Sequence, residues 1–223
     1  MTPTLRFYFD YISPYAYLAW QWVGDMCAEH GVELEPIPVL FAGLLGHWGH
    51  LGPAEIPPKR AFVFRDAYRI ASLNDVPIAL PDTHPFNPLV ALRVSTLEVA
   101  GEQQQEVIEA LWQHIWGKGI SPNSPQIVAE ALDKAGLDGK SLVAKTSSPE
   151  VKQALKDNTA SFIEEGGFGV PGFLYEGELF WGNDQRPYIE RWLKGERGYD
   201  PELLDTLIAQ KFGVRRKRPD DTE

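Results

Sequence analysis

A short stretch near the N-terminus, residues 5 to 19, constrains the fold more than any other part of the sequence. Leu5 to Phe9 is a short apolar and aromatic run of the kind that forms a buried strand. Ser13 and Pro14 follow it, and an apolar pattern with helical spacing continues from there. Serine is favoured as a helix cap, and proline is favoured at the first helical position. The stretch therefore predicts strand, short loop and helix, with the Ser13 hydroxyl at the helix N-terminus.

The predicted position of Ser13 has a chemical consequence as well as a structural one. Free backbone N–H groups and the helix dipole favour negative charge at a helix N-terminus. A thiolate brought to Ser13 would therefore be stabilised. Caps of this kind are common, so the alternative that Ser13 is only a helix cap stays open.

The segments that follow predict a β-α-β unit. The first helix should run from Pro14 to His30, with Gly31 suited to its C-terminal cap. Glu33 to Leu40 has the composition of a second strand, interrupted by Pro36 and Pro38. Because proline removes donors from the ladder, this should be an edge strand or an irregular one. A β-α-β order implies a right-handed crossover and a parallel pair of strands.

Phe41 to Pro58 is rich in glycine and proline and carries His47, Trp48 and His50. Such a segment predicts a loop or a broken helix, which could contact a substrate or could simply pack. The spacing of His47 and His50 could suggest a metal site. No acidic or cysteine partner follows at ligand spacing, so we expect no metal here.

The middle of the chain is predicted to be entirely helical. The loop Pro81 to Pro88 cannot be regular structure, and Asn87 should cap the helix that follows it. The β-α-β pattern is not completed into a sheet here, so this region should be an insertion. The predicted helices are Lys59 to Asn74, Leu89 to Ala100, Gln103 to Trp116 and Ser124 to Ala135.

The last part of the chain returns to strands. Glu176 and Gly177 form a predicted tight hairpin turn, because glycine supplies a positive φ there. Asn183 and Asp184 should cap the final helix, which ends at Leu193. The fold class is therefore α/β, with a mixed sheet in the order β-α-β, helical insertion, α-β-β-α. The other predicted elements are a helix from Ser148 to Glu165 and strands from Gly172 to Tyr175 and Glu178 to Trp181.

Composition limits the class of function. The formal net charge of −10 argues against a nucleic-acid partner or an anionic membrane surface. Cys27 is the single cysteine, which excludes an internal disulfide, and a buried structural thiol is expected there. No apolar run approaches the roughly 20 residues needed to span a bilayer, and no signal-peptide pattern opens the sequence. We expect a cytoplasmic protein whose basic run from Arg215 to Arg218 is a solvated tail.

The order of elements matches the thioredoxin fold, in which a Val-Pro or Thr-Pro pair with a cis proline opens the third strand. Val170-Pro171 stands in that place. Ser13-Pro14-Tyr15-Ala16 occupies the position of the Cys-x-x-Cys motif of disulfide oxidoreductases. Both sulfurs are missing, so thiol–disulfide exchange is excluded. The tracts F-Y-F-D-Y-I-S-P-Y-A-Y-L-A, F-G-V-P-G-F and F-W-G-N-D together resemble the 2-hydroxychromene-2-carboxylate isomerase and kappa-class glutathione transferase family, over essentially the whole chain.

The resemblance implies glutathione as the cofactor and a reversible thiol adduct as the route to cis–trans isomerisation of an aromatic keto acid. Glutathione would lie along the edge at Val170 and Pro171, with its sulfur hydrogen-bonded to the Ser13 hydroxyl. A helix N-terminus and a hydrogen bond to the charged form both lower a thiol pKa. The γ-glutamyl end would be held by Trp181, Gly182, Asn183 and Asp184.

The resemblance also places the substrate against the helical insertion and suggests a homodimer. The order of predicted elements gives a thioredoxin-like domain formed by residues 1–40 and 145–213, a helical insertion domain at 41–144 and a tail at 214–223. The alternative hypotheses are a glutathione transferase or peroxidase that acts on small electrophiles, and a non-enzymatic thioredoxin-like module that holds peptides. Candidate donors to an acidic substrate are His47, Lys59, Arg60 and His84, with Trp48 and Phe86 as aromatic walls.

Overall fold

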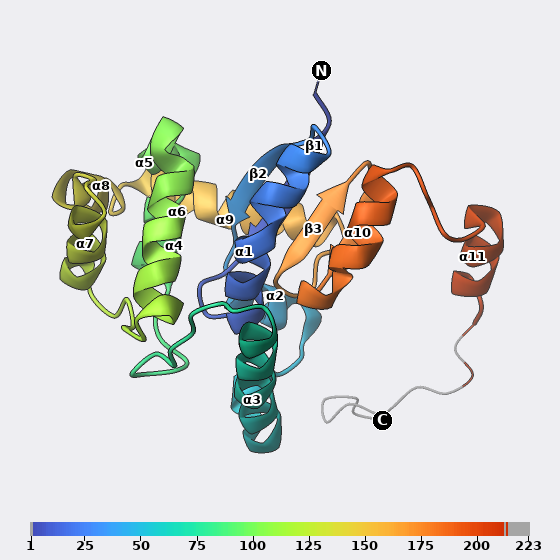
Figure 1. Cartoon of the computed structure of the whole chain (residues 1–223), viewed down its shortest axis with the longest axis horizontal. Helices are drawn as coiled ribbons and strands as arrows, with labels where there is room; N and C mark the ends of the chain where they lie inside the picture. Colours follow the sequence, from blue (N-terminus) through green and yellow to red (C-terminus); the bar gives the residue numbers. More distant parts are fainter. Residues whose placement is uncertain (1, 212, 214–223) are drawn as a thin grey trace, which may run out of the picture. The chain divides into compact units, whose positions relative to one another are not determined.

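The computed structural model describes residues 2–211 and 213 (Figure 1). Contacts divide the chain into two compact units, residues 1–186 and residues 187–223. The first unit contains the whole sheet and most helices, whereas the second contains most of α10 (Arg186–Leu193) and all of α11 (Pro201–Ile208). The predicted division into a thioredoxin-like domain and a 41–144 insertion domain stays a prediction. The predicted tail at 214–223, including Arg215 to Arg218, lies outside the described residues.

A four-stranded mixed sheet forms the centre of the first unit. Its order is β2-β1-β3-β4, with β1 parallel to β2 and antiparallel to β3, and with β3 antiparallel to β4. The predicted thioredoxin fold is confirmed, and β2 lies at the edge, where its two prolines interrupt no interior ladder. The strands are β1 (Thr4–Phe9), β2 (Glu33–Pro38), β3 (Gly172–Tyr175) and β4 (Glu178–Trp181).

Helices cover both faces of this sheet. Neighbouring residues of β1 point to opposite faces, so Phe7 lies 6.0 Å from the ring of Trp20 on α1 (Pro14–Glu29). Tyr8 stacks at 4.0 Å on Phe162 of α9 (Pro149–Glu164). Figure 1 shows α1 in front of the strands and α9 behind them. The α9 face holds a buried cluster that joins Tyr8 and Phe162 to Val39, Leu44, Val170 and Leu174.

The remaining helices of the first unit lie between β2 and α9 in the sequence. Within the described residues, no helix is both long and apolar enough to cross a bilayer. These helices are α2 (Phe41–Trp48), α3 (Pro57–Leu73), α4 (Leu89–Val94), α5 (Leu97–Ala100), α6 (Gln104–Trp112), α7 (Pro125–Lys134) and α8 (Gly139–Lys145). Short 3-10 turns occupy Pro53–Glu55, Gly101–Gln103 and Asn183–Gln185, and a π-helical turn occupies Gln113–Gly117.

Several predicted boundaries are wrong, each for a local reason. The helix expected from Leu89 to Ala100 breaks at Ser95 and Thr96, whose hydroxyls donate to the backbone oxygens of Ala91 and Arg93. Such local bonds compete with the helical ladder. The segment from Phe41 to Pro58, expected to be a loop or a broken helix, contains the helix α2 and the 3-10 turn Pro53–Glu55, whereas α8 and α11 were not predicted.

Candidate active site

Ser13 caps α1 as the sequence predicts. Its Oγ accepts a hydrogen bond from the backbone N–H of Ala16 at 3.2 Å, and its hydroxyl donates to the backbone oxygen of Val170 at 3.3 Å. Only 8% of the Ser13 surface is exposed. The hydroxyl therefore lies between the first turn of α1 and the loop that leads into β3.

The Val170-Pro171 peptide bond is cis, as expected from the fold. Among the residues that the structure describes, none accepts a hydrogen bond from the Val170 backbone N–H. The Pro171 oxygen accepts from the backbone N–H of Gly182 at 3.0 Å. The loop at Val170 is thus fixed on its β4 side, while its amide is available to an extended ligand that runs past Ser13.

Three exposed aromatic rings surround the loop that precedes Val170. Trp48 donates from Nε1 to the backbone oxygen of Gly167 at 2.9 Å. Phe168 and Trp181 meet edge to face, with their ring centroids 4.9 Å apart. A Cβ at Gly169 would lie 2.5 Å from the Trp181 Nε1, so glycine is needed for this close approach. Trp48, a predicted aromatic wall, therefore borders the same loop as Trp181.

Asn183 has a role that differs from the predicted helix cap. Its Oδ1 accepts a hydrogen bond from Nε1 of Trp22 at 2.9 Å. The 3-10 turn at this point is capped by Gly182, which has a φ of 111°, and no side chain caps it. The carboxylate of Asp184 accepts from Nε2 of Gln185 at 3.4 Å. Asn183 and Asp184 thus do not cap the 3-10 turn at this point, and the Asn183 oxygen accepts from the indole of Trp22.

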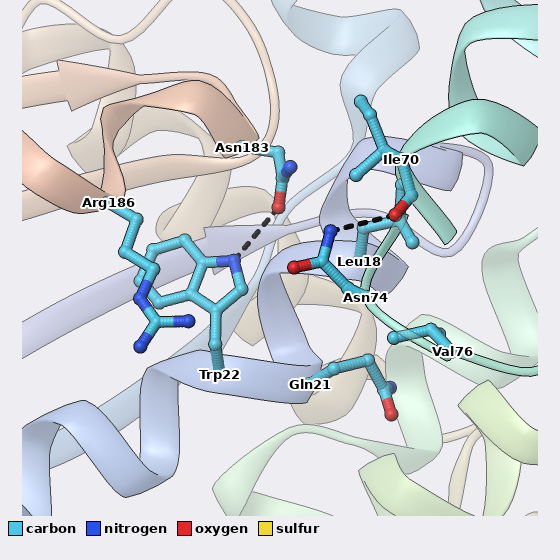
Figure 2. A pocket seen from close by; sticks show the side chains of 8 residues that line it. All are labelled: Leu18, Gln21, Trp22, Ile70, Asn74, Val76, Asn183 and Arg186. Carbon is cyan, nitrogen blue, oxygen red and sulfur yellow. Dashed lines mark hydrogen bonds between the residues drawn. The ribbon is translucent and has the colours of Figure 1, made fainter. Parts of the chain in front are cut away.

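A cavity of about 310 Å³ lies beside α1 and includes Asn183 in its wall (Figure 2). Figure 2 shows Trp22 and Arg186 on one side, and Ile70, Asn74 and Val76 facing them across the cavity. The guanidinium carbon of Arg186 lies 5.7 Å from the centroid of the Trp22 ring. Leu18 and Gln21 complete the lining.

Sequence reasoning missed most of this lining. Leu18 and Trp22 come four and eight residues after Pro14, so they share one face of α1. That spacing was the available signal, but it does not reveal that α3 and the 183–186 segment lie opposite. Of the predicted site residues, only Asn183 lines the cavity.

His84 reaches the loop that precedes Ser13. Its Nε2 donates to the backbone oxygen of Ile12 at 2.9 Å, and Arg60 donates to the backbone oxygen of His84 at 3.0 Å. The ring lies edge to face with Phe86 at 5.9 Å. Burial lowers the pKa of His84, with a smaller opposing effect from its bond to Ile12. His84 and Arg60 are thus brought together, and Phe86 is buried behind them rather than exposed as a wall.

The helix α3 also approaches the N-terminus of α1. The hydroxyl of Tyr15 donates to Asp66 at 2.8 Å. Lys59 precedes Asp66 by seven residues, so it lies on the same face of α3, about 10 Å further along the axis. The exposed Lys59 is therefore on the face that α3 turns toward α1.

His47 lies on α2 rather than on α3, and its ring is edge to face with Trp48 at 4.9 Å.

The only cysteine of the sequence is unsuited to nucleophilic chemistry. Cys27 is 2% exposed and lies in the last turns of α1. Burial raises its pKa to about 12, so the thiol stays protonated at neutral pH. Any thiolate that acts beside Ser13 must come from another molecule.

Comparison with known proteins gives the family. The DSBA-like thioredoxin domain matches residues 4–194. A 2-hydroxychromene-2-carboxylate isomerase from Sphingobium xenophagum is 30% identical over 198 residues, which are 86% of this chain and 99% of that protein. Glutathione S-transferase kappa 1 from Rattus norvegicus is 25% identical over 221 residues, or 92% of this chain and 96% of that protein.

A solved structure of selenomethionine 2-hydroxychromene-2-carboxylate isomerase shares the fold, with a TM-score of 0.76 at 24% identity. The match covers 93% of this chain and 100% of that one. The strands and helices around Ser13 and the cis proline are thus those of a known family. This chain belongs to the DsbA-like thioredoxin family, with 2-hydroxychromene-2-carboxylate isomerases and kappa glutathione S-transferases among its relatives.

Proposed function

We propose that this chain is a glutathione-dependent cis–trans isomerase of aromatic acids of the 2-hydroxychromene-2-carboxylate and trans-o-hydroxybenzylidenepyruvate type. The observation that carries the proposal is the Ser13 hydroxyl, held between the first turn of α1 and the Val170 oxygen. Two relatives with isomerase and glutathione S-transferase in their names support it.

The residues present fit glutathione. At Ser13 a hydroxyl and a helix N-terminus favour a bound thiolate, and the protonated Cys27 does not compete with it. The Val170 amide suits the backbone of the cysteinyl residue in an extended pose. The γ-glutamyl end carries an amine and a carboxylate. Asn183 and Asp184 would hold it, with Trp181 and Gly182 beside them.

When bound, glutathione supplies a thiolate that adds reversibly to the conjugated double bond, which allows rotation before elimination. The chain's part is to keep that sulfur ionised and to orient the acid. When glutathione binds, the Ser13 hydroxyl would turn its single proton from the Val170 oxygen to the negative sulfur, which would lower the pKa of the thiol. Lys59, Arg60 and His47 would attract the substrate carboxylate, and Trp48 would stack on its ring.

The role proposed for His84 differs from that of a donor to the substrate. Its Nε2 already donates to Ile12, so we propose that it supports the Ser13 loop rather than donating to the substrate from that nitrogen. The buried Phe86 packs against it. The homodimer and the division into a thioredoxin-like domain and a helical insertion are part of the same proposal, and light scattering tests the dimer.

Product analysis distinguishes the proposal from its main rival. An isomerase returns the thiol, so we expect isomer to accumulate while the glutathione concentration stays constant. A transferase would consume one glutathione for each molecule of electrophile and build up conjugate. A non-catalytic module would give neither product, and Ser13→Ala would then change no turnover.

Trp22→Phe is expected to weaken glutathione binding about tenfold, because it removes the hydrogen bond that fixes the Asn183 oxygen. Isothermal titration calorimetry measures the affinity. The matched control is Trp20→Phe on the same helix, which removes a bond from Nε1 to Glu109. Equal affinity losses in both variants would argue against a γ-glutamyl site at Asn183.

A further inference from the structure

Asp10 is a buried carboxylate that sits at the end of β1, three residues before Ser13. It is 1% exposed. Its Oδ1 accepts from the backbone N–H of Ile12 at 3.1 Å, and its Oδ2 accepts from that of Phe41 at 2.9 Å. Its backbone oxygen accepts from the N–H of Ser13 at 3.0 Å. A single residue therefore holds the loop that ends at Ser13 and the first residue of α2.

These bonds connect the parts of the candidate site that are distant in sequence. The helix that starts at Phe41 ends at Trp48, whose indole donates to Gly167 beside the cis-proline loop. Ile12 is fixed on both of its peptide groups, because its oxygen accepts from His84 while its N–H donates to Asp10. Movement of the Asp10 carboxylate would therefore shift both Ser13 and the α2 wall.

We propose that Asp10 is the positioning residue for Ser13, and that the site for the glutathione sulfur is fully ordered only when the Asp10 carboxyl is ionised. This inference rests on the proposed function for its ligand, although the ordering of the loop can be measured without one. An ionised carboxylate offers acceptors on both oxygens. A protonated carboxyl can still accept hydrogen bonds, but both bonds lose their charge assistance, and the hydroxyl oxygen becomes the weaker acceptor of the two.

The surroundings of Asp10 bring the ionisation of its carboxyl close to neutral pH. Burial raises its pKa to about 7, against the lowering effect of the bonds from Phe41 and Ile12. Tyr11, whose hydroxyl pairs with Ser95, and His84, across Ile12, are the neighbouring titratable groups. Neither neutralises the carboxylate, and within the described residues no salt bridge involving Asp10 is found.

Folding favours the protonated form of Asp10, whereas the proposed positioning of Ser13 requires the ionised form. Because its pKa is raised on folding, the unfolded chain releases the proton at lower pH than the folded chain does. The contribution of Asp10 to stability is therefore greatest at acid pH and declines as pH rises from about 4 to about 7. The form that would order Ser13 is the form that folding disfavours. A purely structural role would give the same dependence of stability on pH but would leave ligand affinity unchanged, so affinity is the measurement that separates the two roles.

The test compares wild type with Asp10→Asn, which keeps the volume but replaces one acceptor by a donor. In wild type, the amide proton shifts of Ile12 and Phe41 should titrate with a midpoint near pH 7, and in the variant these shifts should not change with pH. With S-methylglutathione, whose sulfur cannot ionise, the wild-type affinity should fall as pH drops through neutrality. The variant should bind about tenfold more weakly at alkaline pH, with little pH dependence.

Thermal unfolding supplies the second readout. The fall in Tm between acid and alkaline pH should be smaller in Asp10→Asn than in wild type. The control Asp138→Asn changes an exposed aspartate that also accepts a backbone N–H, from Ser141, and should behave as wild type. Unchanged affinity in Asp10→Asn would overturn the inference, as would a loss of Tm that is equal at every pH. If the amide shifts titrate but wild type binds no ligand, the proposed function fails while the positioning of Ser13 stands.

Discussion

Ser13→Ala is expected to reduce turnover at neutral pH by about tenfold to a hundredfold, which is the effect of losing a hydrogen bond to a charged group. The hydroxyl donates to the backbone oxygen of Val170, and in the proposed complex it would donate to the glutathione sulfur instead. Without it the apparent pKa of the bound thiol should move back toward about 8.5. Ultraviolet absorbance of the bound thiolate across a pH series measures that pKa directly.

The loss of a helix cap must be separated from the loss of a donor. Ser13→Ala also removes the bond from Ala16, which should lower the free energy of unfolding by about 1 kcal/mol. Ser124 is a matched control, because it caps α7 through Ile127 and is also followed by proline. Ser124→Ala should lose similar stability with unchanged turnover. If both variants lose turnover equally, the hydroxyl of Ser13 has no specific role.

Gly172→Ala is expected to lower the free energy of unfolding by about 3 kcal/mol, at the upper end of the cost of overpacking a core. A Cβ at this position would lie 2.4 Å from Cζ of Phe162. That ring is 1% exposed and stacks on Tyr8 at 4.0 Å, so it has no free space to enter. Urea denaturation followed by circular dichroism measures the change in stability.

Two further variants show whether the Phe162 ring causes this loss. Gly24 lies on the exposed side of α1 with nothing within 4 Å of a new Cβ, so Gly24→Ala should stabilise by about 0.5–1 kcal/mol. Phe162→Leu should cost less stability in the Gly172→Ala background than in wild type. If the stability losses of Gly172→Ala and Phe162→Leu were additive, the Phe162 ring would not be the cause of the strain.

The features that could be predicted from sequence are those that local chemistry determines. Ser13 and Pro14 mark the start of α1, because cap and first-turn preferences act within a few residues. The strands Gly172–Tyr175 and Glu178–Trp181 were predicted with the right bounds, since the intervening turn has positive φ at both Glu176 and Gly177. The mixed sheet followed from the order of these elements, and the cis proline was implied by the resemblance to the thioredoxin fold.

The features that could not be predicted depend on contacts between distant residues. The glycines at 43 and 46 left a loop and a broken helix open, and α2 forms because Leu44 is buried and the Phe41 N–H is held by Asp10. Tertiary packing of this kind overrides local propensity. The pairing of Trp22 with Asn183 spans 161 residues, and no local pattern indicates it.

The protonated, enclosed state of Cys27 has a consequence for how the protein should respond to oxidants and alkylating agents. Reagents that attack thiolates find no target in this polypeptide, because the sulfenic, sulfinic and sulfonic products all begin from an accessible ionised sulfur. If glutathione is the cofactor, as proposed above, the thiolate open to these reagents would be that of glutathione. Activity lost to a peroxide pulse would then return when fresh glutathione is supplied, without synthesis of new protein.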